Sequence, residues 1–513
     1  MLDKDKIFAE GFAKGREEGI AIGRERGHSE AVKDAMNALY DSDLYYLTED
    51  DLEDISDILD SLYKGKKNQN HERKLFGTDG VRDLTNTGNM TPETALRLGR
   101  AFIRFNDRQE RAKIVIGRDT RLSCRMLEGA LYSGMSSEGA DIYLAGVIPT
   151  PGISFAVKHL KADGGAVISA SHNPAEYNGI KFLGSDGCKL SDDEELAIEE
   201  LLDHEAGQSQ YVGTVHDCPE LVGLYAEHIA SLLNDDAVID GVAFDCANGA
   251  SSVTVPVLIE HSGFRNVRTS VIARDYDGLN INRDCGVMHM ENLTEYVKAN
   301  GLALGFAFDG DADRVLISDK YGRIIDGDII LWVLGRWLAK NNYPGSDKVA
   351  VTVMSNMALE THLAHEGIKA LRCPVGDRYV LETMRRSGAG LGGEQSGHII
   401  ASAFTDTGDG LCTAMLFLNA IQDLGEDPSG LVERFGRYPQ RLTNLTLKRP
   451  RDEVDMSAVN AIVSEYQAKV TDGRIFIRTS GTEPLLRILV EAPKKNLVEE
   501  LSDILASRLE CFC

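Results

Sequence analysis

The stretch that decides the expected fold of this chain is Ile168-Ser169-Ala170-Ser171-His172-Asn173-Pro174. It follows an apolar, strand-like segment at 166–168. The Asn-Pro pair predicts a turn, because proline disfavours the helical conformation in the residue before it. A hydroxyl on a loop at the end of a strand is placed to receive and return a chemical group. The stretch therefore predicts a reactive serine, Ser171, at the end of a strand.

The same pattern recurs along the chain. Short apolar runs at 114–116, 242–244, 306–308 and 349–353 each lead into a polar or glycine-containing loop and then a helical pattern. This alternation is typical of α/β units that carry functional loops at the carboxyl ends of their strands. The last seventy or so residues differ, and we expect a small α+β unit there with a strand at 474–477. A length of 513 residues favours three or four domains.

Charge and cysteine usage exclude several classes of protein. The formal net charge of −25 makes a nucleic-acid partner unexpected. A phosphate site must then be a local cluster of Arg, Lys and backbone N–H groups. The nine cysteines occur without a CxxC pair, which indicates reduced thiols and a cytoplasmic location. No apolar run approaches about 18 residues, so we expect no membrane span.

Residues 1–73 differ from the rest of the chain. Glycines recur every four residues from Gly11 to Gly27, which places them along one stripe of a helix. That stripe could be a site of self-association or bind a partner helix, or the segment could be a weakly helical solvated tail. Residues 41–63 contain nine acids and no base, and a polar linker follows at 64–74. We therefore predict an acidic helical extension.

An acidic loop follows the predicted strand at 306–308. Asp309, Asp311 and Asp313 are spaced so that a curled loop brings their carboxylates together. Hard oxygen ligands without nearby Cys or His indicate Mg²⁺. Calcium fits less well, because Lys320 stands where a calcium loop of this type has glutamate. The alternative is an acidic solvated turn, against which Arg314 and the apolar flanks argue.

Two further loops carry polar groups. Arg478 heads the segment 478–484, in which hydroxyls and an exposed glycine backbone can bind an anion. Arg487 lies close enough to join, and the alternative is a hairpin-like turn. In the segment 392–398, Glu394 and Ser396 could bind neighbouring sugar hydroxyls, or the segment could be an ordinary loop.

Together these loops resemble those of the α-D-phosphohexomutase superfamily. Five motifs occur in the family's order across residues 74–513: an FGTDGxR-type loop at 76–82, the serine loop, the acidic loop, the sugar loop and the phosphate loop. Within the superfamily the chain most resembles the bacterial branch that acts on glucosamine phosphates. That resemblance rests on Gln395 after Glu394, and on the stretches 277–286 and 375–380.

The resemblance implies an α/β fold of four domains around a central cleft: three related α/β domains and a C-terminal α+β domain, after an N-terminal helical extension. The expected limits are 1–73 for the extension, 74–228 for domain I with the phosphoserine loop, 229–326 for domain II with the metal loop, 327–440 for domain III with the sugar loop and 441–513 for domain IV with the phosphate loop.

It also implies the roles of individual residues. Ser171 would be a phosphoserine and would bind one Mg²⁺ together with Asp309, Asp311 and Asp313. Lys181 would be the general base or acid, with a pKa lowered by a cationic cleft. The phosphoryl group would be polarised by Arg82, Arg314 and His172, although His172 could instead only hold the loop. The substrate would be bound by Glu394, Ser396, His398, Arg478, Ser480, Gly481, Thr482 and Arg487.

The implied activity is interconversion of glucosamine 6-phosphate and glucosamine 1-phosphate through a 1,6-bisphosphate. Glucosamine or glucose 1,6-bisphosphate would prime the enzyme, and the product would feed UDP-N-acetylglucosamine and cell-wall precursor synthesis. The alternatives are a phosphogluco- or phosphomannomutase, or a non-catalytic scaffold that uses residues 1–73. Those residues could also form a homo-oligomer.

Overall fold

The computed structural model describes residues 75–512, except for 78, 107–110, 203–210, 235–238, 449–452, 468, 471 and 480–484. Internal contacts divide the chain into two units, Met1–Arg73 and Lys74–Cys513. The predicted acidic extension, with its possible partner helix or oligomer contact, lies outside the described residues. The description that follows concerns the second unit.

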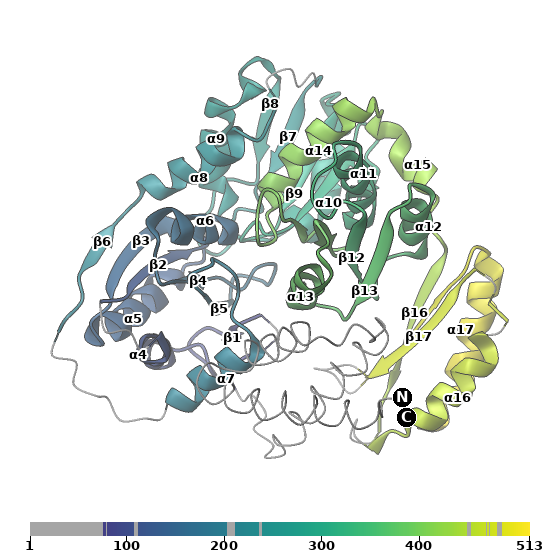
Figure 1. The fold of residues 1–513 in the computed structure, drawn as a ribbon, viewed down its shortest axis with the longest axis horizontal. Helices are drawn as coiled ribbons and strands as arrows, with labels where there is room; N and C mark the ends of the chain where they lie inside the picture. The colour runs from purple at the N-terminus through teal and green to yellow at the C-terminus, as the bar shows by residue number, and fades with distance from the viewer. Residues whose placement is uncertain are drawn as a thin grey trace, which may run out of the picture. The chain divides into compact units, whose positions relative to one another are not determined.

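The first sheet has six strands in the order β1-β5-β4-β2-β3-β6 (Figure 1). Strand β5 runs antiparallel to both its neighbours, whereas β4, β2, β3 and β6 pair in parallel. The strands are β1 (Val81–Leu84), β2 (Lys113–Arg118), β3 (Asp141–Val147), β4 (Gly164–Ile168), β5 (Tyr177–Leu183) and β6 (Val215–Asp217). The helices are α4 (Pro92–Asn106), α5 (Cys124–Ser137), α6 (Thr150–Leu160), α7 (Asp192–Leu201) and α8 (Glu220–Ala230).

The second sheet has five strands in the order β11-β10-β9-β7-β8. Its strands are β7 (Val242–Asp245), β8 (Thr269–Ile272), β9 (Leu304–Phe308), β10 (Val315–Asp319) and β11 (Ile324–Ile325). Its helical segments are α9 (Ser251–His261), η1 (Gly263–Asn266), η2 (Gly286–Met288) and α10 (Met290–Ala299). The parallel strands β8, β7 and β9 carry the α/β part, and β9 then pairs antiparallel with β10.

The third sheet has four strands in the order β13-β12-β14-β15. Its strands are β12 (Lys348–Thr352), β13 (Lys369–Cys373), β14 (Leu391–Gly393) and β15 (Ile399–Ala401). Its helical segments are α11 (Gly327–Lys340), α12 (Met357–His365), α13 (Asp377–Ser387), α14 (Gly410–Leu424), η3 (Pro428–Gly430) and α15 (Leu431–Phe435). Helices α11 and α14 are apolar on nearly all sides because they pack in the interior, where each is capped by an aspartate, Asp326 and Asp409 respectively.

The fourth sheet is antiparallel, with three strands in the order β16-β18-β17. It consists of β16 (Gln440–Thr446), β17 (Arg474–Thr479) and β18 (Leu485–Glu491), with α16 (Met456–Gln467), α17 (Lys495–Leu509) and η5 (Glu510–Phe512). These elements have their own apolar core, whereas one continuous core joins residues of the first three sheets.

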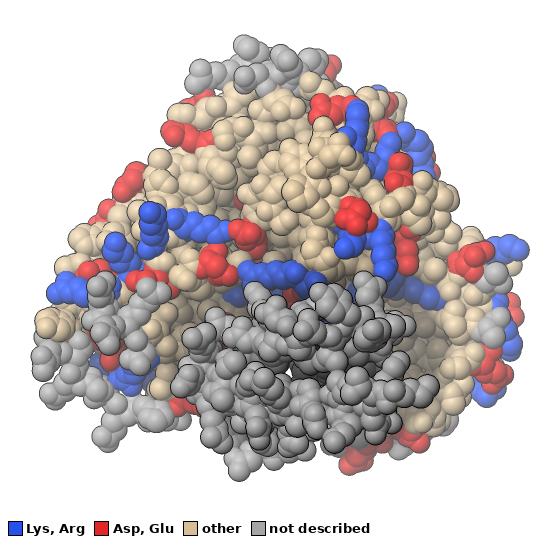
Figure 2. All heavy atoms as spheres, in the orientation of Figure 1, with Lys and Arg blue, Asp and Glu red and all other residues tan. Residues whose placement is uncertain are grey.

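The predicted fold class is confirmed. Each apolar run that predicted a strand is a strand, and three α/β units precede an α+β unit. The strands are buried on both faces, which explains their unbroken apolar sequences: β4, β7 and β9 are buried at every position. In the described part of the chain no helix is long and apolar enough to cross a membrane. On the face shown in Figure 2, basic and acidic side chains are interspersed despite the net negative charge.

Candidate active site

Ser171 lies on a tight loop after β4. Its backbone has a φ of 51°, in the left-handed region that residues other than glycine rarely adopt. Its N–H donates to Oγ of Ser169 over 2.9 Å, and its own Oγ donates to Oδ2 of Asp309 over 2.7 Å. Nδ1 of His172 lies 3.3 Å from the same hydroxyl. The serine is buried, so its hydroxyl faces the acidic loop rather than bulk water.

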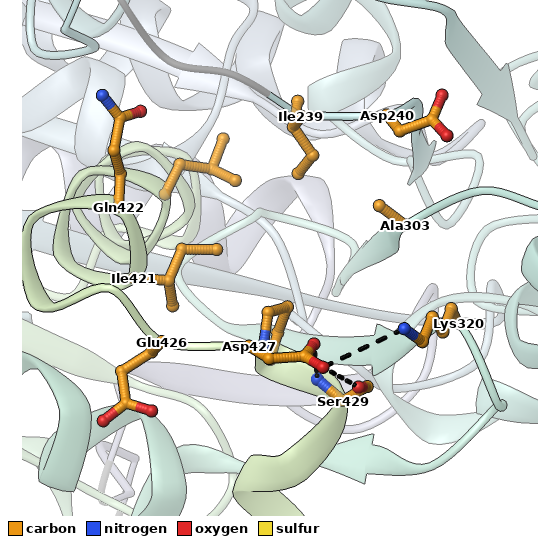
Figure 3. Close-up of a pocket in the computed structure, with 11 residues that line it drawn as sticks. Ile239, Asp240, Ala303, Lys320, Ile421, Gln422, Glu426, Asp427 and Ser429 are labelled. Carbon is orange, nitrogen blue, oxygen red and sulfur yellow. Dashed lines mark hydrogen bonds and ion pairs between the residues drawn. The ribbon is translucent and has the colours of Figure 1, made fainter.

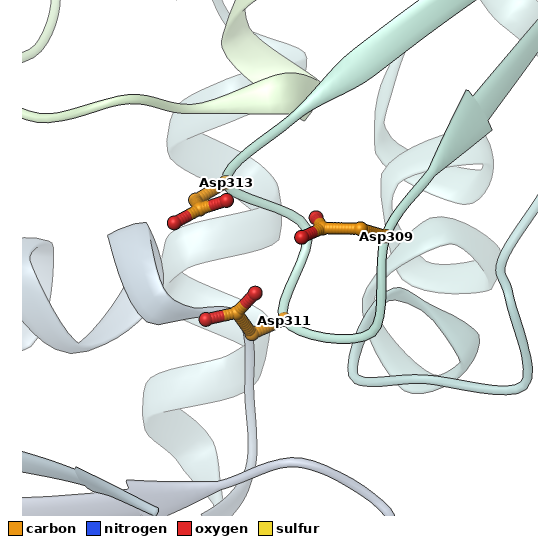
Figure 4. A group of neighbouring side chains, drawn as sticks. All are labelled: Asp309, Asp311 and Asp313. Carbon is orange, nitrogen blue, oxygen red and sulfur yellow. The ribbon is translucent and has the colours of Figure 1, made fainter. Parts of the chain in front are cut away.

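The acidic loop follows β9, as predicted. Asp309, Asp311 and Asp313 are buried, and one oxygen of each lies within 4.8 Å of the others. Figure 4 shows the three carboxylates directed toward a common space. Burial and then the neighbouring Asp313 and Asp311 raise the pKa of Asp309 well above its ordinary value. One oxygen each of Asp311 and Asp313 is buried without a hydrogen-bond partner. An all-oxygen site with unsatisfied carboxylates fits a divalent cation such as Mg²⁺.

Lys181 lies on β5 and reaches the same space. Its Nζ is 3.1 Å from Oδ2 of Asp311 and 2.9 Å from Oδ2 of Asp79. The expectation of a lowered pKa is wrong: burial alone would lower the pKa of Lys181, but Asp311 and Asp79 together raise it. Two carboxylates therefore lie beside this lysine, which the sequence alone did not show.

Three cationic or polarising groups were predicted beside the serine. Arg82 is ion-paired with Asp79, and Nε of Arg314 lies 3.8 Å from Oδ1 of Asp313. The carboxylates of Asp313 and Asp309 outweigh burial and raise the pKa of Arg314. By contrast, burial and the nearby Arg314 and Arg82 lower the pKa of His172 to about 4. His172 therefore offers a neutral imidazole near neutral pH, whereas the arginines offer positive charge.

The sugar loop connects β14 to β15 and borders the acidic loop. Glu394 accepts a hydrogen bond from the Gly376 N–H over 3.0 Å and lies 3.3 Å from Oγ of Ser396. His398 is buried, with Nε2 3.6 Å from Oδ2 of Asp377 and 4.0 Å from Oδ2 of Asp313. Backbone pairing between Arg314 and His398 joins the two loops. The structure thus brings the predicted serine, metal and sugar loops together.

Sequence reasoning missed a lysine and a threonine at this site. Lys189 is ion-paired with Asp79 and Asp377, and these two carboxylates raise its pKa despite burial. Thr150, the first residue of α6, donates its hydroxyl to Oδ2 of Asp311 over 2.7 Å. Asp79 lies in the FGTDGxR-type loop at 76–82 and Asp377 in the stretch 375–380, so the sequence marked the segments that contain these two partners. Nothing in the local sequence marked Lys189 or Thr150.

The predicted phosphate-binding residues lie on the C-terminal sheet. Arg478 on β17 and Arg487 on β18 are register partners. Burial and the charge of Arg487 lower the pKa of Arg478. Both line a small cavity with Met354, and Ser480, Gly481 and Thr482 lie outside the described residues.

A separate cavity of about 240 Å³ lies between the second sheet and the end of α14 (Figure 3). Its wall is partly apolar, with Ile239, Ala303 and Ile421, and Lys320 and Asp427 lie 4.0 Å apart at one side. None of the predicted site residues lines it, so the serine and acidic loops remain the candidate for chemistry.

Comparison with known families covers most of the second unit. Residues 73–209, 224–322 and 326–438 match the models of phosphoglucomutase/phosphomannomutase alpha/beta/alpha domains I, II and III. Residues 442–507 match the model of the phosphoglucomutase/phosphomannomutase C-terminal domain.

Relatives match over nearly their full length. The phosphoglucosamine mutase of Lactobacillus johnsonii is 42% identical over 447 residues, which are 85% of this chain and 98% of the relative. That of Bacillus subtilis is 41% identical over 435 residues, 83% of this chain and 96% of the relative.

Solved structures share the fold at lower identity. A phosphoglucomutase/phosphomannomutase family protein from Burkholderia thailandensis has a TM-score of 0.73 at 23% identity, covering 85% of this chain and 97% of that one. The Aspergillus fumigatus N-acetylphosphoglucosamine mutase, solved in complex with GlcNAc-6P and magnesium, has a TM-score of 0.57 at 17% identity, covering 80% and 84%.

Proposed function

Because this chain belongs to the phosphoglucomutase/phosphomannomutase family, we propose that it is an isomerase that interconverts glucosamine 6-phosphate and glucosamine 1-phosphate. The sugar preference is supported by the phosphoglucosamine mutases that are 41–42% identical over 83–85% of the chain. The observation that carries the chemistry is the 2.7 Å hydrogen bond from Ser171 Oγ to Asp309, inside a buried cluster of three carboxylates. We also propose that the four domains span the ranges predicted from the sequence, which are 74–228, 229–326, 327–440 and 441–513.

Ser171 is the proposed phosphoryl carrier. When bound, Mg²⁺ held by Asp309, Asp311 and Asp313 supplies positive charge that offsets the phosphoserine dianion. Arg82 and Arg314 add fixed cations around the same group. The free hydroxyl of the substrate forms a new O–P bond as the bond between phosphorus and Ser171 Oγ breaks. The substrate then carries two phosphates, and the serine is left unmodified.

Lys181 is the proposed proton donor and acceptor. Asp311 and Asp79 keep it protonated, so in the arrangement described it is suited to give a proton to Ser171 Oγ as that oxygen leaves phosphorus. The proton that the substrate hydroxyl releases as it attacks returns to the same amine, and the return step reverses these two transfers. His172, whose pKa is lowered to about 4, contributes a neutral hydrogen-bonding group.

The remaining site residues bind the sugar phosphate. We assign the phosphate that is not transferred to Arg478 and Arg487 with Ser480, Gly481 and Thr482, and the ring hydroxyls to Glu394, Ser396 and His398. The 1,6-bisphosphate must turn around in the cleft before it returns a phosphoryl group to Ser171. The same bisphosphate, or its glucose counterpart, would prime unphosphorylated protein. Such an enzyme would supply UDP-N-acetylglucosamine and cell-wall precursors in the cytoplasm.

A second candidate within the family is a phosphoglucomutase or phosphomannomutase, because the matching family models carry both names. A candidate from a different class is a non-catalytic scaffold that uses residues 1–73 to bind a partner helix or a second copy.

Turnover of glucosamine, glucose and mannose 1-phosphates, with Mg²⁺ and matching 1,6-bisphosphates, tests these proposals. We expect the amino sugar to be preferred, and Ser171→Ala to lose turnover while keeping its fold. Ser133→Ala is the matched control, because the Ser133 hydroxyl is exposed on α5 and bonds only within its own helix in the contacts described. Preference for glucose or mannose would change the pathway and keep the mechanism. A folded, phosphorylated protein inactive on all three sugars would favour the scaffold.

A further inference from the structure

The backbone of the serine loop is held in a strained conformation. The left-handed φ of 51° at Ser171 is unfavourable for a residue with a Cβ atom. Such a conformation persists only where surrounding contacts hold it. Because it sets the direction of the side chain, the groups that hold the loop also aim the Ser171 hydroxyl at Asp309.

Two side chains hold the same two carbonyl groups of this loop. Nη2 of Arg121 donates to the carbonyls of Ser171 and Asn173 over 3.0 and 2.8 Å. Nδ2 of Asn282 donates to the same carbonyls over 2.8 and 3.0 Å. Both donor side chains are buried. The loop is therefore fixed at two points, each by a pair of donors.

The two donors come from different sheets. Arg121 follows β2 of the first sheet and also bonds to Asp119 and to the carbonyl of Tyr177, so it supports the whole loop. Asn282 belongs to the segment after β8 of the second sheet, and its N–H donates to the Ala247 carbonyl over 2.8 Å. Asn282 therefore ties the serine loop of one sheet to the frame of the other.

The acidic loop packs directly against this tie. A Cβ atom at Gly310 would lie 2.5 Å from the Ser171 carbonyl oxygen and 3.0 Å from Nδ2 of Asn282. Both distances are too short, so only glycine permits the approach. The acidic loop therefore packs, through Gly310, against the Ser171 carbonyl group to which Asn282 donates.

We propose that Asn282 is a positioning residue for phosphoryl transfer: it holds the Ser171 backbone so that the hydroxyl faces the acidic cluster. The expected effect on kcat rests on the proposed function, whereas the expected effect on the Ser171 backbone does not. Asn282 acts through the backbone of Ser171 and in the contacts described bonds to no carboxylate of the cluster. Loss of its donors should misplace the hydroxyl without removing a group that binds the sugar phosphate.

Asn282→Gly removes the donors and suits the local backbone, because Asn282 itself has a φ of 59°. We expect kcat to fall about 10- to 100-fold, since a displacement of the order of 1 Å can cost that much, with KM little changed. Asn342→Gly is the matched control, because Asn342 has a φ of 56° and is exposed at the end of α11. Asn342→Gly should retain full kcat.

A second variant and a structural measurement make the test decisive. Asn282→Asp keeps the size of the side chain but has no N–H donor, so the same fall in kcat is expected. Crystal structures of wild type and variants should show the Ser171 φ and its contact with Asp309 change only in the Asn282 variants. Unchanged kcat and Ser171 geometry in a folded Asn282 variant would overturn the inference. If wild type turned over no sugar phosphate, the proposed function would fail. The inference about Asn282 would then be decided by whether the Ser171 φ and the contact with Asp309 change in the crystal structures of the variants.

Discussion

Oγ of Ser171 donates a hydrogen bond to Oδ2 of Asp309 over 2.7 Å, although the two residues are 138 positions apart. The contact joins the loop after β4 in the first sheet to the loop after β9 in the second. Phosphorylation at this oxygen would place a dianion beside three buried carboxylates. Negative charges at such short range cannot all remain ionised without a cation between them. A metal ion held by the acidic loop, as proposed above, would supply such a positive charge beside the serine, in addition to Lys181 and Arg314.

Removal of one carboxylate tests this relationship. Asp309→Asn should raise the melting temperature of the metal-free protein, because burial, Asp313 and Asp311 all disfavour the ionised form of Asp309. The same variant should lose the stabilisation by Mg²⁺ that we expect for wild type, and at least about 100-fold of its turnover. Thermal melts in EDTA and in Mg²⁺ measure the first two effects.

Asp347→Asn is the control for that experiment, because Asp347 is exposed and lies 3.9 Å from Lys348, outside the cluster. It should respond to Mg²⁺ as wild type does. An equal rise in melting temperature with Mg²⁺ in the Asp309→Asn and wild-type proteins would mean that the cluster is not the metal site.

A second carboxylate predicts a pH dependence of stability. Burial raises the pKa of Asp245 to about 6, although it accepts the N–H groups of Gly286 and Ala247. The folded protein holds this proton more tightly than the unfolded chain. The stability of the folded protein that depends on protonated Asp245 is therefore fully present below about pH 4 and is lost as the pH rises through 6. Asp245→Asn removes the titration.

The free energy of unfolding of Asp245→Asn minus that of wild type should accordingly increase by about 2 kcal/mol from pH 4 to pH 7. Urea unfolding at the two pH values measures it, with Asp240→Asn as an exposed control that should show no such trend. A pH-independent difference for Asp245→Asn would show that Asp245 titrates normally in the folded state.

Local sequence was sufficient for the fold class and for the loops. Strand β4 and the loop bearing Ser171 are contiguous, and so are Asp309, Asp311 and Asp313, so spacing alone placed each set at the end of a strand. The fold adds the contacts between distant segments. Lys189 carries no local pattern, because its partners lie 110 and 188 positions away. The pKa of Lys181 was mispredicted for the same reason, since Asp79 and Asp311 come from other loops.

We predict that Arg478 and Arg487 contribute to substrate affinity rather than to the rate of phosphoryl transfer. They are register partners on the C-terminal sheet, and burial together with the charge of Arg487 lowers the pKa of Arg478. A bound phosphate would relieve that repulsion. Arg478→Ala should therefore raise KM about 10- to 100-fold, the loss expected for a charge-assisted contact, with a smaller effect on kcat. Arg441 lies on β16 of the same sheet and is ion-paired with Asp503 of α17, so Arg441→Ala should leave KM unchanged. A fall in kcat alone would contradict a phosphate-binding role.

Gln395 gives the most informative comparison between sequence and structure. It follows Glu394 and is one of the residues on which the resemblance to enzymes of glucosamine phosphates rests. Its side-chain Nε2 nevertheless donates to Oδ2 of Asp326 over 3.2 Å, and its backbone carbonyl accepts the Gly327 N–H over 3.1 Å. Asp326 in turn is ion-paired with Arg437, just before β16. Gln395 thus anchors the sugar loop to the start of α11.

We therefore expect Gln395→Ala to change the ratio of kcat/KM for glucosamine and glucose 1-phosphates by less than about threefold, because the lost contact is with Asp326, which is not among the residues assigned to the sugar. Its stability should fall by about 1 kcal/mol, the net value of one hydrogen bond. Glu394→Gln, at the neighbouring position assigned to the ring hydroxyls, should instead reduce kcat/KM for both sugars. A tenfold or larger change in preference in Gln395→Ala would mean that this side chain, or the loop geometry it sets, selects the amino sugar.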